Sequence, residues 1–508
     1  MTLRRIAPPL ALTALAGCSL APPYHRPEVA TAAPAWKSVE GWRPANPNDG
    51  APRSDWWTTF GDPALNDLVA RADAHNQTLA QAAATWRMAT AATREARASL
   101  FPTVSANGSV THSYSGSGQV ITGSVIPGSG SGTGTGSGST VASGRSATSY
   151  RVNLQASWQP DLFGSVLNTV RNARYTEEAR LADLANARLA LQGELVTDYL
   201  SLRATDAQIA SLTATVEAYK RALTITTNRY NAGIVAHTDV FQAQSQLASA
   251  QSDLEGETRT RAQFEDAIAM LIGENPASYR LPAAADAWAP VVPDVPVSLP
   301  SSLVERRPDI ASAERQVAAA NAQIGVNRAA FFPTIGLTGS GGFENNSLSG
   351  LFSAASALWS LGASVAETLL DFGARSARVA QSRAAYDATV ANYRQVTLTA
   401  FQDVQDNLIA QEVLARQEGY LRTASVAADK SEQTLRNQYQ AGIAVYTDVV
   451  SAQATALSAR RALIQGQLDR QTAIVALIQA LGGGWSAADL ASGAERVRAE
   501  ALDPARAR

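Results

Sequence analysis

Apolar and polar residues alternate with a period of two in four segments, which is typical of strands with one apolar and one polar face. The apolar positions are Val104, Ala106, Gly108 and Val110; Tyr150, Val152, Leu154, Ala156 and Trp158; Ile335, Leu337, Gly339, Gly341 and Phe343; and Trp359, Leu361, Ala363 and Val365. Each segment is close to the ~10 residues that cross a bilayer as a tilted strand. The pattern predicts two membrane-spanning β-hairpins, at 103–159 and 334–367.

A helical pattern follows the first hairpin. No proline interrupts the chain from Ser165 to about Asn228, and apolar residues recur every seven positions, as in a coiled-coil seam. They are Leu195, Leu202, Ile209, Val216, Leu223 and Tyr230. These 64 residues would make a rod roughly 96 Å long at a rise of 1.5 Å per residue.

The rod ends in a turn at Asn231-Ala232-Gly233, where glycine suits a left-handed C-terminal cap. We expect the next helix to begin near Thr238, a suitable N-cap, and to end near Gly273. This returning helix is too short to reach the strands again. A further helix predicted from Pro63 to Leu100, and stopped by Pro102, would supply the missing length if it stacked end to end on the returning helix.

The turn occurs twice. The segment Arg229–Gln244, RYNAGIVAHTDVFQAQ, returns as QYQAGIAVYTDVVSAQ at Gln438–Gln453, 209 positions later. The same offset places Phe163-Gly164 on Phe372-Gly373. An internal repeat of this length indicates one architecture built twice.

Upstream of the first hairpin the offset between the repeats is 231, because Ser99–Thr103 matches Ala330–Thr334. The difference of 22 residues is an insertion between Pro102 and Phe163. A Gly/Ser/Thr tract from Gly128 to Thr140 lies there and predicts a flexible outer loop.

The expected fold class is therefore mainly α, with a transmembrane β-barrel. Four strands are too few to close a barrel. An open sheet in lipid would leave backbone groups unpaired at several kcal/mol each, so several copies of the chain must share one barrel.

The domain organisation follows from these patterns. We expect a signal peptide at 1–17, an extended arm at 18–61 anchored by Trp56-Trp57, a first repeat at 62–275, a linker with six prolines at 276–300, a second repeat at 301–484 and a mobile tail at 485–508.

The first 18 residues have a secretory pattern. Arg4 and Arg5 form a basic region, and the apolar core from Leu10 to Ala16 is too short to span a bilayer permanently. The core ends in Leu15-Ala16-Gly17-Cys18, which resembles a bacterial lipobox and predicts lipidation of Cys18. The alternative is an ordinary signal peptide with an incidental cysteine.

The charge and the motifs of the chain give no indication of a catalytic, metal or nucleotide site. The net charge of −2 gives no reason to expect a nucleic-acid partner. The four histidines, on different segments, form no metal-ligand pair, and the glycine tract lacks the Gly-Lys-[Ser/Thr] ending of a phosphate loop. No Gly-x-Ser-x-Gly elbow occurs, so we expect neither enzymatic activity nor a cofactor.

Two motifs carry a family resemblance over essentially the whole mature chain. Trp56-Trp57 with Phe60-Gly61-Asp62-Pro63 resembles the opening of the outer-membrane factor family, the TolC-like channels. The segment from Leu299 to Ile310, LPSSLVERRPDI, resembles the signature of the NodT-type lipoprotein branch that serves resistance-nodulation-division (RND) efflux pumps. The resemblance implies a homotrimer with a twelve-stranded barrel in the outer membrane and a helical tube across the periplasm.

The resemblance also implies partners and sites. A periplasmic adaptor would meet the tube at its far end, at Tyr230, Gly233, Tyr439 and Gly442, and an inner-membrane RND transporter would supply the cargo. Asp448 falls where TolC-like channels carry a constricting acid, and would be the periplasmic gate. The alternatives are local: both glycines only close helical hairpins, and Asp448, like Asp239, only complements a helix N-terminus.

A passive export duct for small molecules explains strands, rods and lipobox together. A tether between the outer membrane and the cell wall would explain the heptads and the lipid anchor but not four amphipathic strands. A channel for type I protein secretion would use the same fold. The lipobox and the Arg306-Arg307-Pro308-Asp309-Ile310 segment favour small-molecule efflux.

Overall fold

The computed structural model describes residues 19–29, 36–38, 41–43, 55–115, 145–283, 288–293, 307–483 and 485. The predicted signal peptide, Cys18, the Gly128–Thr140 tract, Leu299–Arg306 and all but Trp485 of the tail lie outside these residues. Two compact units make up the chain. The first holds Thr93–Arg171, Asn321–Arg383 and the residues up to Pro23, and the second holds Tyr24–Ala92, Asn172–Ala320 and the rest. Each unit therefore contains parts of both sequence repeats.

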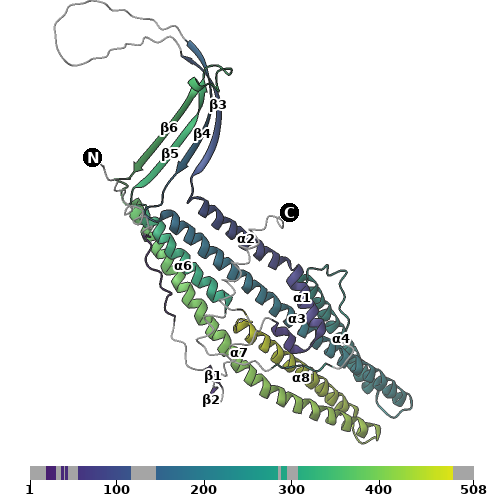
Figure 1. The fold of residues 1–508 in the computed structure, drawn as a ribbon. Helices are drawn as coiled ribbons and strands as arrows, with labels where there is room; N and C mark the ends of the chain where they lie inside the picture. Colours follow the sequence, from purple (N-terminus) through teal and green to yellow (C-terminus); the bar gives the residue numbers. More distant parts are fainter. Residues whose placement is uncertain are drawn as a thin grey trace, which may run out of the picture. The chain divides into compact units, whose positions relative to one another are not determined.

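The first unit is built around a four-stranded antiparallel sheet (Figure 1). Its strands are β3 Thr103–Ser115, β4 Arg145–Trp158, β5 Thr334–Asn345 and β6 Ala357–Ala366, paired in the order β3-β4-β5-β6. The four predicted strands are thus confirmed. Their strict alternation produces one face of apolar side chains and one of polar side chains.

The two β-hairpins have the same register. Thr103 lies opposite Ser157 in the first, and the offsets of 231 and 209 carry this pair to Thr334 opposite Ala366, as observed in the second. Val110 opposite Tyr150 likewise becomes Gly341 opposite Trp359. The sequence repeat is therefore also a repeat of strand pairing.

Each repeat contains one long helical hairpin. Helix α3 Ser165–Asn231 and helix α7 Ala374–Gln440 have 67 residues each, and the returning helices α4 His237–Leu271 and α8 Tyr446–Ala480 have 35 each. A helix of 67 residues is about 100 Å long. The predicted seam is buried at Leu195, Leu202 and Val216. None of the described helices is long and apolar enough to cross a membrane.

The helix expected from Pro63 to Leu100 is interrupted, and this part of the prediction is wrong. Helix α1 Pro63–His75 ends at Asn76, whose backbone is extended, and α2 runs from Gln77 to Ala98. The Asn76 Oδ1 accepts a hydrogen bond from the Leu79 backbone N–H at 2.9 Å, while its Nδ2 donates to the Leu271 carbonyl at 2.8 Å. One buried side chain therefore caps the start of α2 and the end of α4, so the expected end-to-end stacking holds for α2 and α4.

The second repeat has an equivalent junction with different chemistry. Helix α6 Pro308–Ala329 begins next to Arg307, the residue 231 positions after Asn76. The Arg307 Nη1 donates to the carbonyl of Ala480, the last residue of α8, at 3.1 Å. Arg307 also forms an ion pair of 2.7 Å with Asp309.

Trp56 and Trp57 lie in the short 3-10 helix η2, Trp56–Phe60, and are 5% and 7% exposed. This confirms that the two tryptophans anchor the chain before α1. Their core cluster in the second unit also contains Leu65, Leu68, Val69, Leu195, Tyr199, Ile268, Ile272, Ile474 and Val475. Segments from both repeats thus meet in one core.

The segment expected to be an extended arm, 18–61, contains a short element that the sequence pattern did not predict. The strands β1 Trp36–Ser38 and β2 Gly41–Arg43 form a short hairpin. The Trp36 side chain is buried against Phe401 and Leu477, so distant residues stabilise a hairpin that has no local periodicity.

Candidate functional sites: the helical turns and the amphipathic sheet

The two long hairpins turn with the same backbone geometry. In the first, Gly233 has φ of +68°, its N–H donates to the Tyr230 carbonyl, and the Ile234 N–H donates to the Arg229 carbonyl, both at 2.8 Å. Gly442, with φ of +78°, and Ile443 repeat this arrangement. This is the Schellman motif, in which glycine is favoured because a Cβ is strained at positive φ.

Helices α4 and α8, which leave the turns, begin at His237 and Tyr446, two positions earlier than Thr238 and its repeat partner Thr447 would require as N-caps. Ala236 and Val445 are the N-caps of α4 and α8, and neither end has a side-chain capping bond. The prediction of Thr238 as N-cap is therefore wrong. Asp239 and Asp448 lie in the first helical turns, as expected, where a negative charge complements the helix dipole.

The turns expose apolar side chains. Ile234 is 63% exposed and Ile443 is 78% exposed, although this position of a Schellman motif usually packs against its own helix. Val445 and Phe241 are also exposed. In the first turn, the ring of His237 lies between Tyr230, 4.6 Å away, and Phe241, 4.3 Å away.

The four residues named for docking differ in exposure. Tyr230 is 40% exposed and both glycines are exposed, whereas Tyr439 is only 7% exposed. Tyr439 packs in a cluster with Ala243, Tyr446 and Val449, and this cluster joins the two turns. Burial, the largest cause, raises the pKa of Tyr446 to about 12.

Arg229 adds a polar link between the turns that the sequence did not reveal. Its Nη1 donates to the Tyr439 carbonyl at 3.2 Å, and its guanidinium lies 4.6 Å from the centre of the Tyr439 ring. Such cation–π contacts contribute on the order of 1 kcal/mol. The signal in the sequence that could have suggested Arg229 is a difference between the repeats: the second turn has Gln438 at the position where the first has Arg229.

The sheet of the first unit is amphipathic. Exposed apolar side chains line one face: Val104, Val110, Val152, Leu154, Trp158, Leu337, Trp359, Leu361 and Val365. The other face carries a 2.6 Å ion pair between Arg151 and Glu344 and a 2.8 Å contact between the Ser340 and Ser360 hydroxyls. Such a sheet fits hydrocarbon on one side and water on the other.

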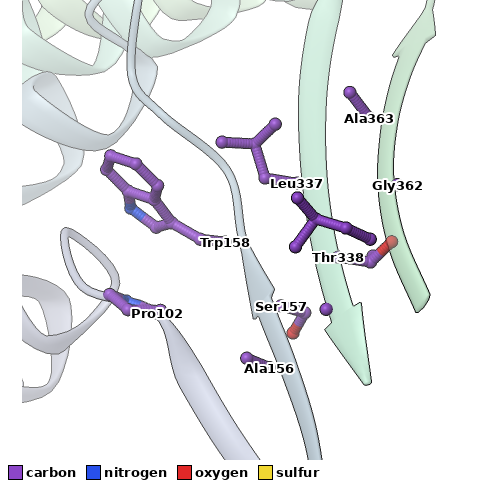
Figure 2. Close-up of a pocket in the computed structure, with 10 residues that line it drawn as sticks. Pro102, Ala156, Ser157, Trp158, Leu337, Thr338, Gly362 and Ala363 are labelled. Atoms are coloured by element: carbon purple, nitrogen blue, oxygen red, sulfur yellow. The ribbon is translucent and has the colours of Figure 1, made fainter. Parts of the chain in front are cut away.

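Small residues leave a hollow on the apolar face (Figure 2). Its volume is ≈ 450 Å³, and its lining includes Trp158, Leu337, Gly339, Leu361 and Gly362. The indole of Trp158 donates to the Leu100 carbonyl at 3.0 Å. The lining is mostly apolar, so the hollow is suited to hydrocarbon rather than to a polar substrate.

No group of three His, Cys, Asp or Glu side chains that could hold a metal ion occurs among the described residues. Strands β3 and β6, at the two edges of the four-stranded sheet, each pair with one neighbour only in the described part of the chain. The features with functional potential are thus the two turns and the sheet.

Comparison with known proteins identifies a matching family model and similar individual proteins. The family model described as "outer membrane efflux protein" matches residues 68–274 and 299–483. The outer membrane protein OprJ of Pseudomonas aeruginosa is 31% identical over 477 residues, covering 94% of this chain and 95% of OprJ. The toluene efflux pump outer membrane protein TtgC of Pseudomonas putida is 32% identical over 481 residues, covering 94% and 95%.

The fold is also similar to that of solved structures. The crystal structure of a membrane protein from Pseudomonas aeruginosa superposes with a TM-score of 0.81 at 30% identity, over 92% of this chain and 98% of the other.

Proposed function

The chain belongs to the outer membrane efflux protein family, and from this membership we propose that it is the outer-membrane channel of a tripartite RND-type efflux system. It is a passive duct that carries small molecules, such as drugs and other toxic compounds, across the periplasm and the outer membrane. Its partners are a periplasmic adaptor, an inner-membrane RND transporter and further copies of itself.

The observation that carries the proposal is the combination of two elements in one chain. An amphipathic sheet with strands of bilayer-spanning length is followed, in both repeats, by a helical hairpin whose first helix has 67 residues. About 100 Å of helix is far more than a compact core requires. A conduit that extends from a membrane into an aqueous compartment requires both elements.

The sheet supports a barrel made from several copies. Its edge strands β3 and β6 have unpaired backbone groups on one side within the described residues, and each such group costs several kcal/mol in lipid. Pairing with neighbouring copies removes this cost. Three copies contribute twelve strands, and the number three follows the family.

The turns are the proposed adaptor-docking tips. Gly233 and Gly442 hold the tight backbone, and Ile234, Ile443 and Val445 present exposed apolar side chains there. Exposed apolar side chains gathered at one place favour a protein partner. Tyr439 contributes from inside, because its buried ring supports the turn that carries Ile443.

Asp448 is the proposed gate. Its side chain is exposed near the start of α8, next to the second turn. Three copies around a narrow axis would bring three like charges together, which attracts cations and repels anions.

The test is complementation in a strain that lacks the gene. The wild-type chain should restore resistance to toxic small molecules. Gly442→Val should keep the trimer and lose resistance, because a β-branched residue is strained at positive φ by about 1 kcal/mol or more. Trimer content is measured by gel filtration and resistance by growth inhibition.

Gly419→Val is the matched control. Gly419 is exposed in α7 of the same hairpin, and an added Cβ there meets nothing within 4 Å. It should therefore keep both trimer and resistance. Equal loss of trimer and resistance in Gly442→Val would show that the glycine only closes the hairpin.

A further inference from the structure

The first unit contains one junction that joins the two repeats and two edges that are open. Strand β4 of repeat one pairs with β5 of repeat two, whereas β3 and β6 have no outer neighbour among the described strands. If copies share a barrel, β6 of one copy meets β3 of the next. That contact is the counterpart of the β4–β5 contact, because β6 repeats β4 and β3 repeats β5.

The internal repeat therefore determines the register of the contact between copies. Adding 231 to a residue of β3 gives its partner in β5, and adding 209 to a residue of β4 gives its partner in β6. Where the second hairpin is long enough, these shifts convert each residue pair of β3–β4 into the observed pair of β5–β6. Applied to β4–β5, they convert Leu154 opposite Gly341 into Ala363 opposite Val110 of the next copy. In the same way, Ala156 opposite Gly339 becomes Val365 opposite Gly108 of the next copy.

Aromatic residues mark the same contact just beyond the strands. Phe163, between β4 and α3, stacks on Phe332, between α6 and β5, with ring centres 4.9 Å apart and planes at 20°. The same offsets carry these two residues to Phe372 and Phe101. Both are uncovered in the single chain, with exposed fractions of 92% and 67%.

Phe372 is held in place at a conformational cost. It is the one non-glycine residue of the described chain with a positive φ, 50°. Asp371 accepts hydrogen bonds from the backbone N–H groups of Gly373 and Arg375 and from the Arg375 Nε. Arg375 also donates to the Ala330 carbonyl at 3.2 Å, which ties this loop to the segment before β5. Strain maintained by such a network indicates a functional position for the side chain.

For the shared barrel of the proposed function, we propose a specific contact between copies. Strand β6 pairs with β3 of the next copy in the register that places Ala363 opposite Val110 and Val365 opposite Gly108, and Phe372 of one copy stacks on Phe101 of the next. The interface between copies then repeats the interface between the two repeats inside each copy. This inference rests on the proposed function, which requires a barrel shared between copies.

Cysteine pairs test the register in the full-length trimer. Directly opposite residues of antiparallel strands have Cα atoms about 4.5–5.5 Å apart, which lies within the range of a disulfide. The variants Val365→Cys/Gly108→Cys and Ala363→Cys/Val110→Cys should form disulfide-linked dimers and trimers on oxidation, visible on non-reducing gels. Gly108 has room for the new side chain, since an added Cβ meets nothing within 4 Å.

The matched control recombines the same cysteines. In Val365→Cys/Val110→Cys the two positions are out of register by two residues, about 7 Å along the strand, and should not cross-link. The wild type, with its single Cys18, reports background. Trimers that cross-link only in the shifted pair would overturn the proposed register and leave the channel function intact. Absence of any association between copies would overturn both.

Alanine variants test the aromatic pair. Phe372→Ala and Phe101→Ala should each lower the temperature at which the trimer dissociates in detergent. The double variant should lose no more than the worse single variant, because either change already removes the stack. Additive losses, or no loss from Phe101→Ala, would show that Phe372 contacts lipid instead of the next copy.

Discussion

At the scale of single residues, a comparison of Asp239 with Asp448 distinguishes the effect of a negative charge at a helix N-terminus from the proposed role of Asp448 in the gate. Asp239 and Asp448 are repeat partners, each the third residue of a helix whose N-cap offers no side-chain acceptor. Each should therefore stabilise its helix by about 0.3–1 kcal/mol. Their surroundings differ, because Asp239 is half-buried near Tyr446 and Asp448 is exposed.

This difference makes a matched pair for testing the gate. Asp448→Ala should raise the conductance of the reconstituted channel or weaken its preference for cations, because three like charges leave the axis. Asp239→Ala removes the same helix-end charge and should change conductance less. The measurement is single-channel current in a planar bilayer. Small and equal changes in the two variants would leave Asp448 with its helix-end role alone.

At the scale of secondary-structure elements, the helices of each repeat are joined end to end rather than continuous. Asn76 uses its backbone and both side-chain polar atoms at the junction of α1, α2 and α4. Close approach is possible because Gly273, with φ of +76°, lies against His75, and an added Cβ would come within 2.6 Å of the His75 carbonyl oxygen.

We expect Asn76→Ala to destabilise the protein by about 1–3 kcal/mol, because it removes an N-cap and leaves the Leu271 carbonyl without its donor. The midpoint of thermal unfolding, followed by the helical circular dichroism signal, should fall. Gln77→Ala is the neighbouring control, since Gln77 is exposed, and it should change stability by no more than about 0.5 kcal/mol. Similar midpoints for the two variants would contradict a capping role.

At the scale of the whole molecule, the residues after Cys18 are tied to the unit that contains the sheet. The Ser19 hydroxyl donates to Asn168 Oδ1 and accepts from Arg171 Nη1, both at 3.0 Å. Asn321 Nδ2 donates to the Pro22 carbonyl at 2.9 Å. A lipid on Cys18 would thus be attached next to a segment that is held firmly in the sheet-containing unit.

Lipidation of Cys18 remains a prediction and has a direct test. Cells grown with labelled palmitate should label the wild-type chain and not Cys18→Ser. The variant should still be made, so its amount is followed by immunoblot. An unlabelled wild-type chain that retains its signal peptide would contradict the lipobox interpretation.

Much of the fold could be predicted because it depends on patterns of residues that are close together in the sequence. The period of two identified the strands and their faces, the seven-residue spacing identified the long helices, and the repeated glycines identified both turns. Each of these features depends on neighbouring residues and on backbone geometry alone. The docking and gate roles of the turn residues and of Asp448 came instead from the resemblance to TolC-like channels.

Contacts between distant segments were not predictable in this way. The break at Asn76 depends on a carbonyl 195 positions away, and the burial of Trp36 depends on Phe401. Tyr230 and Tyr439 are equivalent in the repeat, yet only Tyr439 is buried.

By itself, the sequence determined the strands, the rods, the turns and the two offsets that relate the repeats. Only the tertiary structure decided which member of a repeated pair is buried and which is exposed, as with Tyr439 and Tyr230. The physical reason is that a pattern along the chain specifies which face of an element is apolar, whereas burial depends on what packs against that face.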